Sequence, residues 1–460
     1  MVWVANHHDE QQDCNKQHHM HHKFYQGSID KGSLDFTMTP AATPPPSSLA
    51  FSQSQLRPAD RVGLWVWWFA CHLILLGVLA TTEIPEGDIR YYFSSLRGEF
   101  PDGLTEYPAI GTWPAHVVFW FSHRSTEHYL AMFGGFCMVI DGLFFVLLLN
   151  SGAARSRKSQ ILAAGFWAVF AVCTGHVSVQ RLDLVPAVLV GVAALLLFYY
   201  PRISSALLGT ATMIKLWPGV LAIGLVRGYK RKATYWCIAV FVGTIIGLSA
   251  LVAMISGVQR LLSPFTYQGV RGLQIESIAA TPMIVRGAFG AAAEYSVTYA
   301  ASKSYEITGP GVDAAIMVTN VLMFATLVFA VAWALRGFVK DTWSPDGSLI
   351  MWVTLIFMLL VANKVFSPQY ILWLGPIMAV VLLRTNGSKY PLALAWLMLL
   401  MAVLGQIVYP YYYDDVVHPG TGTLGVIGLA IRNGLMVVSM IVSLMWAISH
   451  RPAANAQANA

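Results

Sequence analysis

Long runs of apolar residues constrain this chain more than any other feature. From about residue 63 they recur with lengths near 20 residues, which is the length that an α-helix needs to cross the hydrocarbon core of a bilayer. Only 11% of the 460 residues are charged, whereas a water-soluble domain carries about 25%. These properties exclude a cytosolic enzyme, a disordered protein and a disulfide-stapled secreted module. We therefore expect an all-α polytopic membrane protein.

Ten of the runs are predicted to span the membrane. They are 63–81, 129–150, 160–177, 183–200, 233–256, 311–335, 347–363, 369–384, 391–409 and 424–449. Asp141 lies inside the second run and needs a structural partner, because an unpaired charge within a membrane is costly. A further apolar stretch, 205–226, contains Lys215 and Pro218, a charge and a helix breaker. Since basic residues flank this stretch on both sides, we predict a re-entrant hairpin there, with a conventional span as the alternative.

The positions of the loop charges predict the orientation of the spans. Basic residues are enriched in cytoplasmic loops, and the chain has three basic clusters: Arg155–Lys158, Arg227–Lys232, and Arg336 with Lys340. With ten spans and the hairpin, both termini are cytoplasmic. The exoplasmic side then carries a long first loop (about 82–128) and a long middle loop (about 257–310).

The two ends of the chain differ in composition from its centre. Residues 1–60 are rich in His, Gln, Pro and Ser and hold too little apolar surface to fold. We therefore divide the chain into a disordered cytoplasmic tail (1–60), a membrane domain (61–450) and a short cytoplasmic tail (451–460).

Other ligand classes are poorly supported by the composition. The net charge of +6 arises from short loop clusters, which is typical of membrane topology rather than of nucleic-acid binding. Four of the five cysteines lie within apolar runs and no Cys-x-x-Cys spacing occurs. We expect no nucleic-acid partner, no metal site and no cofactor.

Acids and aromatic residues gather in the first predicted loop. Asp88 is followed by Tyr91 and Tyr92, and Glu106 is followed by Tyr107. A carboxylate in this setting can act as a general base toward a hydroxyl group, and aromatic faces suit sugar rings. The alternative is a solvated loop with tyrosines at the membrane interface.

Cations and one further acid recur near the ends of later runs. Arg181 and Asp183 form either part of a functional site or a pair that neutralises itself. Lys215 lies where a helix breaks, a position suited to an anionic headgroup. Arg271 and Lys364 are candidates to hold a phosphate, although single basic residues at such places are often snorkelling or loop charges.

The order of these motifs resembles that of a known enzyme family, the actinobacterial glycosyltransferases of family eighty-seven. The matching residues are Asp88 with Tyr91-Tyr92, Glu106-Tyr107-Pro108, Arg181-Leu-Asp183, Lys215-x-x-Pro218, and Phe366-Ser-Pro-Gln369-Tyr370 with Trp373 and Pro376. The resemblance covers about 63–450. It implies a GT-C-like helical bundle with a catalytic cavity at the exoplasmic face of the cell membrane, and a polyprenyl-phosphate sugar as donor.

The resemblance and the placement of charges together imply roles for individual residues. Asp88 would be the general base of an inverting transfer to a glycolipid or polysaccharide acceptor, with Glu106 orienting the acceptor or replacing Asp88. Lys215, Arg271 and Lys364 would neutralise the leaving phosphate. The remaining residues expected to contact substrate are Tyr91, Tyr92, Tyr107, Arg181, Asp183 and Gln369.

The sugar and the class of function stay open at this point. The family's mannosyltransferases have Asp-Leu-x-x-Tyr and Tyr-Pro-Pro, where this chain has Asp-Ile-Arg-Tyr-Tyr and Glu-Tyr-Pro-Ala. Mannose is the first expectation and arabinofuranose the alternative. A transporter or flippase of lipid-linked sugars is the alternative from another class. It predicts paired broken spans in two related halves, whereas the sequence has one re-entrant stretch and no internal repeat.

Overall fold

The computed structural model describes residues 54–81, 86–385 and 388–450. Most of the tail predicted for 1–60, namely residues 1–53, and the tail predicted for 451–460 lie outside the described residues. The backbone is described across 267–270, but the side chains there are not.

Seven helices are long and apolar enough to cross a membrane. They are α2 (Pro58–Thr81), α5 (Thr126–Leu149), α10 (Lys232–Val270), α12 (Val312–Lys340), α13 (Pro345–Ala362), α15 (Lys389–Gln406), which continues through the π turn η5 (Ile407–Tyr411), and α17 (Leu424–Ser449). Long apolar sequences with few interior Gly or Pro residues favour unbroken helices of this length. α10 bends where Gly257 adopts a φ of +83°, which a glycine tolerates. The expectation of a polytopic, predominantly helical membrane protein is thus confirmed.

Three other predicted spans form shorter or more polar helices in the centre of the bundle. The run 160–177 corresponds to α6 (Arg157–Thr174), 183–200 to α8 (Leu184–Leu196), and 369–384 to the 3₁₀ helix η4 (Pro368–Trp373) with α14 (Gly375–Arg384). α14 is buried at nearly every position. These helices do not qualify as spans by length and hydropathy, so the count of ten spans stays a prediction.

The stretch predicted to be a hairpin is interrupted where Lys215 occurs. α9 (Pro201–Ile214) ends before Lys215, which is extended with φ −153° and ψ 137°, and the 3₁₀ helix η1 (Trp217–Leu225) follows. The two segments pack on each other: a Cβ on Gly219 of η1 would lie 3.0 Å from the Thr212 methyl group of α9. The position of this hairpin in a bilayer stays a prediction.

The two long predicted loops contain regular structure. The first holds α3 (Gly87–Leu96) and α4 (Ala109–Phe121), and in the second α10 continues to Val270. A small antiparallel sheet follows in the order β1-β3-β2; its strands are β1 (Leu273–Gln274), β2 (Ser296–Tyr299) and β3 (Tyr305–Thr308). The remaining short helices are α7 (His176–Gln180), α11 (Thr281–Arg286), η2 (Gly287–Ala291), η3 (Ala292–Glu294) and α16 (Tyr413–Val417). This small sheet was not predicted from the sequence, because its strands are too short to give a periodic signal.

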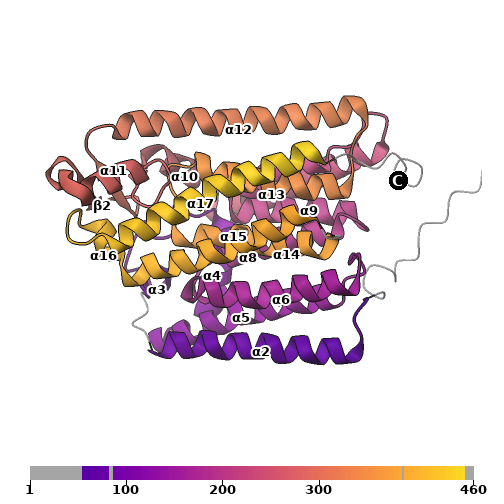
Figure 1. The fold of residues 1–460 in the computed structure, drawn as a ribbon, viewed down its shortest axis with the longest axis horizontal. Coiled ribbons are helices and arrows are strands. Elements are labelled where there is room, and N and C mark those ends of the chain that lie inside the picture. The colour runs from indigo at the N-terminus through magenta and orange to yellow at the C-terminus, as the bar shows by residue number, and fades with distance from the viewer. Residues whose placement is uncertain (1–53, 82–85, 386–387, 451–460) are drawn as a thin grey trace, which may run out of the picture. The chain divides into compact units, whose positions relative to one another are not determined.

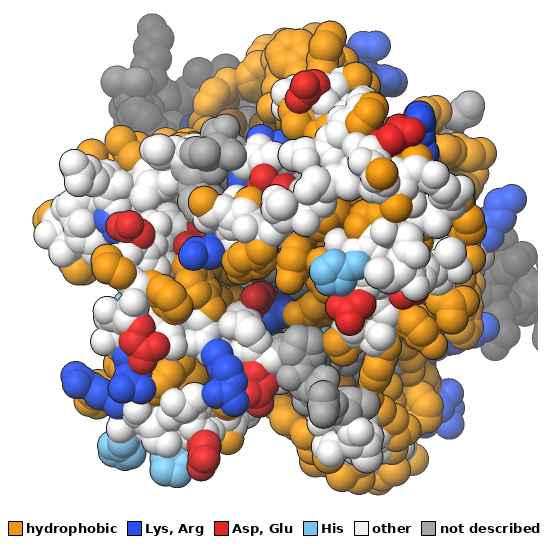
Figure 2. Space-filling view, turned by 90° about the vertical axis from the view of Figure 1, so that its left-hand side faces the viewer, with side chains coloured by type: hydrophobic (Ala, Val, Ile, Leu, Met, Phe, Trp, Pro, Cys, Tyr) orange, Lys and Arg blue, Asp and Glu red, His pale blue; other side chains and the backbone are white. Residues whose placement is uncertain are grey.

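The described part of the chain has two chemically different ends. At one end, which we call the basic end, Arg155 and Arg384 both bind Asp346, and the backbone N–H of Tyr229 donates to the carbonyl of Phe338. The other end, the loop end, carries α3, α11, the sheet and α16 (Figure 1). Figure 2 looks onto the loop end and shows acidic and basic side chains around a recess, with hydrophobic side chains on the flanks.

Asp141 has the structural partners that its position requires. Its carboxylate accepts a hydrogen bond from the Trp68 indole at 2.7 Å, and the Nε2 atom of His72 lies 3.1 Å from the same oxygen. The rings of Trp68 and His72 are stacked with centroids 3.9 Å apart. This cluster joins α2 to α5 and explains the buried acid without a catalytic role.

Candidate functional site

A cavity of about 540 Å³ lies at the loop end. Residues from α3, the break after α9, the middle loop and the connection between α13 and η4 line it. The predicted site residues among them are Asp88, Tyr91, Glu106, Tyr107, Arg181, Lys215, Arg271 and Gln369. Tyr92, Asp183 and Lys364 do not line the cavity; each contacts a residue that does, namely Tyr107, Lys215 and Arg271, respectively. Residues far apart in the sequence are therefore brought to one place.

Asp88 faces the cavity, and its carboxylate pairs with the buried guanidinium of Arg181. It lies in the first turn of α3, and its Oδ2 atom is 2.8 Å from Nη1 of Arg181. The Arg181 side chain is 2% exposed and that of Asp88 is 41% exposed. A buried guanidinium thus orients a carboxylate that remains open to a ligand.

Asp183 pairs with Lys215, so the expected alternative of a self-neutralising Arg181–Asp183 pair was wrong. Oδ1 of Asp183 accepts hydrogen bonds from Nζ of Lys215 at 2.5 Å and from the Trp373 indole at 2.7 Å. The Lys215 ammonium also lies over three aromatic rings, with centroid distances of 4.9 Å to Tyr370, 5.5 Å to Trp373 and 5.9 Å to Tyr107. Cation–π contacts of this kind hold a lysine head group in a fixed position.

The second acid, Glu106, belongs to a tyrosine cluster. The hydroxyl of Tyr91 donates to Glu106 at 3.1 Å, and burial raises the pKa of the Glu106 carboxyl. Tyr92 is almost wholly buried, and its hydroxyl lies 3.4 Å from that of Tyr107. Arg260 of α10 donates to the Tyr107 carbonyl at 2.8 Å. Tyr92 and Arg260 therefore fix the segment that carries Glu106 and Tyr107.

The two cations predicted near the middle loop have different positions. Arg271 lines the cavity, whereas Lys364 donates from Nζ to the Arg271 carbonyl at 2.5 Å. Two further hydrogen bonds join the same segments: Gln274 N–H donates to the Lys364 carbonyl, and Phe366 N–H donates to the Gln274 side chain, each at 3.0 Å. Lys364 thus holds the Arg271 segment in position instead of facing the cavity.

A buried ion pair behind the cavity was not predicted from the sequence. Glu276 lines the cavity wall yet is 0% exposed, and its Oε2 atom is 2.8 Å from Nη1 of Arg432. Its Oε1 atom accepts a hydrogen bond from the hydroxyl of Tyr413 at 3.3 Å. The sequence held one signal for this pair, because Arg432 lies inside an apolar run and an intramembrane arginine requires a partner.

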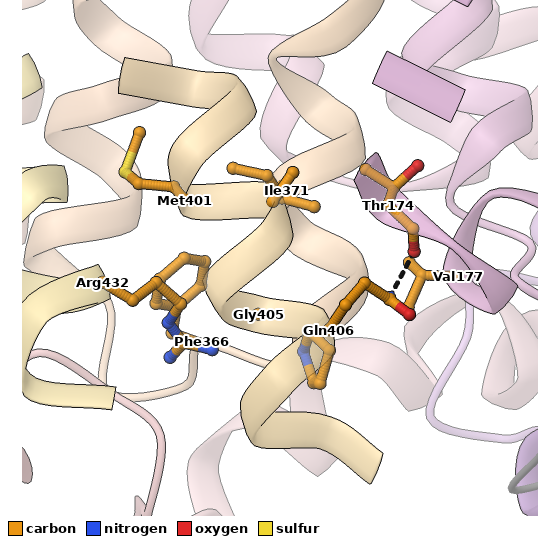
Figure 3. Close-up of a pocket in the computed structure, with 10 residues that line it drawn as sticks. Thr174, Val177, Phe366, Ile371, Met401, Gly405, Gln406 and Arg432 are labelled. Carbon is orange, nitrogen blue, oxygen red and sulfur yellow. Dashed lines mark hydrogen bonds between the residues drawn. The ribbon is translucent and has the colours of Figure 1, made fainter. Parts of the chain in front are cut away.

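A second pocket lies beside this ion pair but is too small for a ligand (Figure 3). Its volume is about 10 Å³, room for about one water molecule. The Gln406 amide donates to the Thr174 carbonyl on one side, and the Arg432 guanidinium lies 4.6 Å from the Phe366 ring centroid on the other. This pocket is a feature of helix packing.

Within the described residues, no three His, Cys, Asp or Glu side chains are grouped so that they could share a metal ion. Comparison of the chain with protein-family models, curated proteins and solved structures finds no match. The function must therefore be argued from the chemistry of the cavity.

Proposed function

We propose that this protein is a membrane glycosyltransferase that moves a sugar from a polyprenyl-phosphate donor to a glycolipid or polysaccharide acceptor. Mannose is the sugar that we propose first. The observation that carries the proposal is the arrangement of one open carboxylate, Asp88, in the same cavity as the fixed cation Lys215 and several aromatic rings. A general base, a site for a leaving phosphate and faces for sugar rings are the components that such a transfer needs.

The chemistry proceeds by one displacement. The acceptor oxygen attacks the anomeric carbon while Asp88 takes the proton from that hydroxyl, and the bond from the anomeric carbon to the phosphate oxygen breaks. The polyprenyl phosphate leaves from the opposite face, so the configuration at that carbon inverts. Lys215 and Arg271 stabilise the charge of the departing phosphate, and Glu106 orients the acceptor.

The apolar part of the cavity supports a lipid-linked donor. Pro264 of α10 and Met323 of α12 line it, and these two helices are the least buried of the candidate spans. Both expose many large apolar side chains. The polyprenyl chain would lie between these helices and the bilayer, with the loop end at the exoplasmic face of the cell membrane and both termini in the cytoplasm.

A flippase of lipid-linked sugars is a second candidate, favoured by one observation. Two apolar segments that border the cavity are interrupted, one at Lys215 and one at 363–367, between α13 and η4. Broken helices at a substrate site are typical of transporters.

The test uses membranes from a host that lacks the protein. They are supplied with radiolabelled polyprenyl-phosphate mannose or polyprenyl-phosphate arabinose, with and without the protein. We expect label to pass from the mannose donor to glycolipid or glycan only when the protein is present. Label from the arabinose donor alone would change the sugar to arabinofuranose. Movement of intact donor across the membrane, with no transfer from either donor, would contradict the enzyme and support the flippase.

A further inference from the structure

Four tyrosines form a connected group on the wall of the cavity, and neither the sequence motifs nor the proposed catalysis uses them. Tyr299 of β2 and Tyr305 of β3 have ring centroids 5.2 Å apart. Tyr305 lies 5.9 Å from Tyr413, and Tyr413 lies 4.8 Å from Tyr409. All four line the cavity. The sheet, η5 and the first residue of α16 thus contribute one continuous aromatic wall.

This tyrosine wall shares its cavity with the proposed general base. Burial, together with the negative charges of Asp88 and Glu106, raises the pKa of the Tyr299 hydroxyl. Tyr409 lines the same cavity as Asp88 and Arg181. A ligand bound against these rings would therefore lie in the same cavity as the Asp88 carboxylate.

The wall is separate from the group that surrounds Lys215. That group comes from the break after α9 and from η4, and it contains the stacked rings of Trp217, Trp373 and Tyr370. Among the described residues, no ring contact joins it to the four tyrosines. A leaving phosphate belongs with Lys215, so the tyrosine wall is available to the other reactant.

The wall offers the groups that recognise a polyhydroxylated ring. Tyrosines combine an apolar face with a hydroxyl that donates and accepts hydrogen bonds. Tyr299 is 61% exposed and so presents a free surface. A plain lipid alcohol has no ring to lie on these faces.

We propose that Tyr299, Tyr305, Tyr409 and Tyr413 are the acceptor subsite and bind a sugar unit of the acceptor, apart from the site of the donor phosphate at Lys215. This inference rests on the proposed function for its place in a reaction. The binding that it describes can be measured without any reaction.

The first experiment measures binding alone. The purified protein in lipid nanodiscs is mixed with methyl α-mannoside, methyl α-arabinofuranoside or isoprenol, and saturation-transfer NMR reports the contact. We expect at least one glycoside to bind and isoprenol not to bind. Tyr299→Ala should weaken glycoside binding about tenfold, a change within the range of aromatic contacts, and Tyr299→Phe should retain most of it. Tyr412→Ala, at an exposed tyrosine outside the cavity, is the matched control. Absence of glycoside binding to the wild type, or equal binding to Tyr299→Ala, would overturn the inference.

The second experiment separates this inference from the proposed function. With the labelled donor, Tyr299→Ala should raise the KM for the saccharide acceptor about tenfold and leave the KM for the donor within about twofold. An unchanged acceptor KM overturns the inference while the glycosyltransferase stands. Glycoside binding that depends on Tyr299, without transfer from any donor, supports the inference and counts against the enzyme.

Discussion

The buried pair of Glu276 and Arg432 allows the structure to be tested without knowledge of the substrate. Their side chains are 0% and 3% exposed, and the ion pair spans 2.8 Å. Arg432 also donates to the Glu276 backbone carbonyl at 2.9 Å. The pair therefore joins the middle loop, which carries β1, to α17. The change to make is Glu276→Gln, which keeps the shape of the side chain and removes its charge.

The expected cost follows from burial. Removal of one partner of a buried ion pair costs about 3–5 kcal/mol, because the other charge is left without compensation. Glutamine can still accept one hydrogen bond from Arg432, so we expect the lower figure, about 3 kcal/mol. That corresponds to a change of more than about 100-fold in the unfolding equilibrium.

The same loop provides a matched control. Arg286 and Glu294 form an ion pair at 2.8 Å with side chains 61% and 41% exposed. Exposed pairs contribute little, so Glu294→Gln should change the free energy of unfolding by less than about 0.5 kcal/mol. The difference between the two variants in the free energy of unfolding then measures the effect of burying the ion pair.

The assay is unfolding by dodecyl sulfate in maltoside micelles near pH 7, followed by tryptophan fluorescence. The double variant Glu276→Gln with Arg432→Met should be more stable than the sum of the single changes predicts, by at least about 1.5 kcal/mol. Burial raises the pKa of Glu276 against the opposing effect of Arg432. A cost below about 1 kcal/mol for Glu276→Gln, together with additive single changes, would show that the carboxyl is neutral, and it would refute the reasoning.

Two other predictions concern stability. Burial raises the pKa of Glu106 above its ordinary 4.5. The stability that the protonated carboxyl contributes is therefore fully present below about pH 4.5 and is lost as the pH rises through its pKa in the folded protein. Glu106→Gln should therefore gain stability relative to the wild type between about pH 4.5 and neutral pH, as measured by unfolding at both; a pH-independent difference would contradict this. Asp141→Ala leaves the Trp68 indole and the His72 ring without their acceptor and should cost about 2–3 kcal/mol. A cost under about 0.5 kcal/mol by the same assay would show that these contacts do not join α2 to α5.

The sequence predicted those parts of the molecule that depend on hydrophobicity and on isolated charges. The long spans follow from run length alone. The break at Lys215 follows from a charge and Pro218 within an apolar stretch. Asp141 could be assigned a structural partner because the cost of an unpaired charge does not depend on the fold.

The rest depends on contacts between distant segments. The pairing of Arg181 with Asp88 and of Lys215 with Asp183 requires that α3, α8 and α9 converge, and no local pattern encodes this convergence. The neighbours Arg181 and Asp183 point to different partners because Arg181 is extended before α8 begins. Lys364 was predicted to face a phosphate, but it binds a backbone carbonyl that only the folded middle loop brings near.

The tyrosine wall was missed for a related reason. Two of its members come from the pair of strands β2 and β3, and the other two come from η5 and α16, more than a hundred residues further along the chain. Each alone is an ordinary interfacial tyrosine. Only the pairing of β2 with β3, in the register that places Tyr299 opposite Tyr305, brings two of them together.

The most direct test of the mechanism measures the rate of sugar transfer by the purified Asp88→Asn variant. This substitution keeps the size of the side chain and removes the base. Asp102→Asn is the control, because Asp102 lies exposed in the same region and does not line the cavity. With labelled polyprenyl-phosphate mannose, single-turnover transfer should fall by at least about 100-fold in Asp88→Asn and remain within about twofold of the wild type in Asp102→Asn. Donor binding should be retained by both variants. Full transfer by Asp88→Asn would contradict the assignment of the base and with it the mechanism proposed for this cavity.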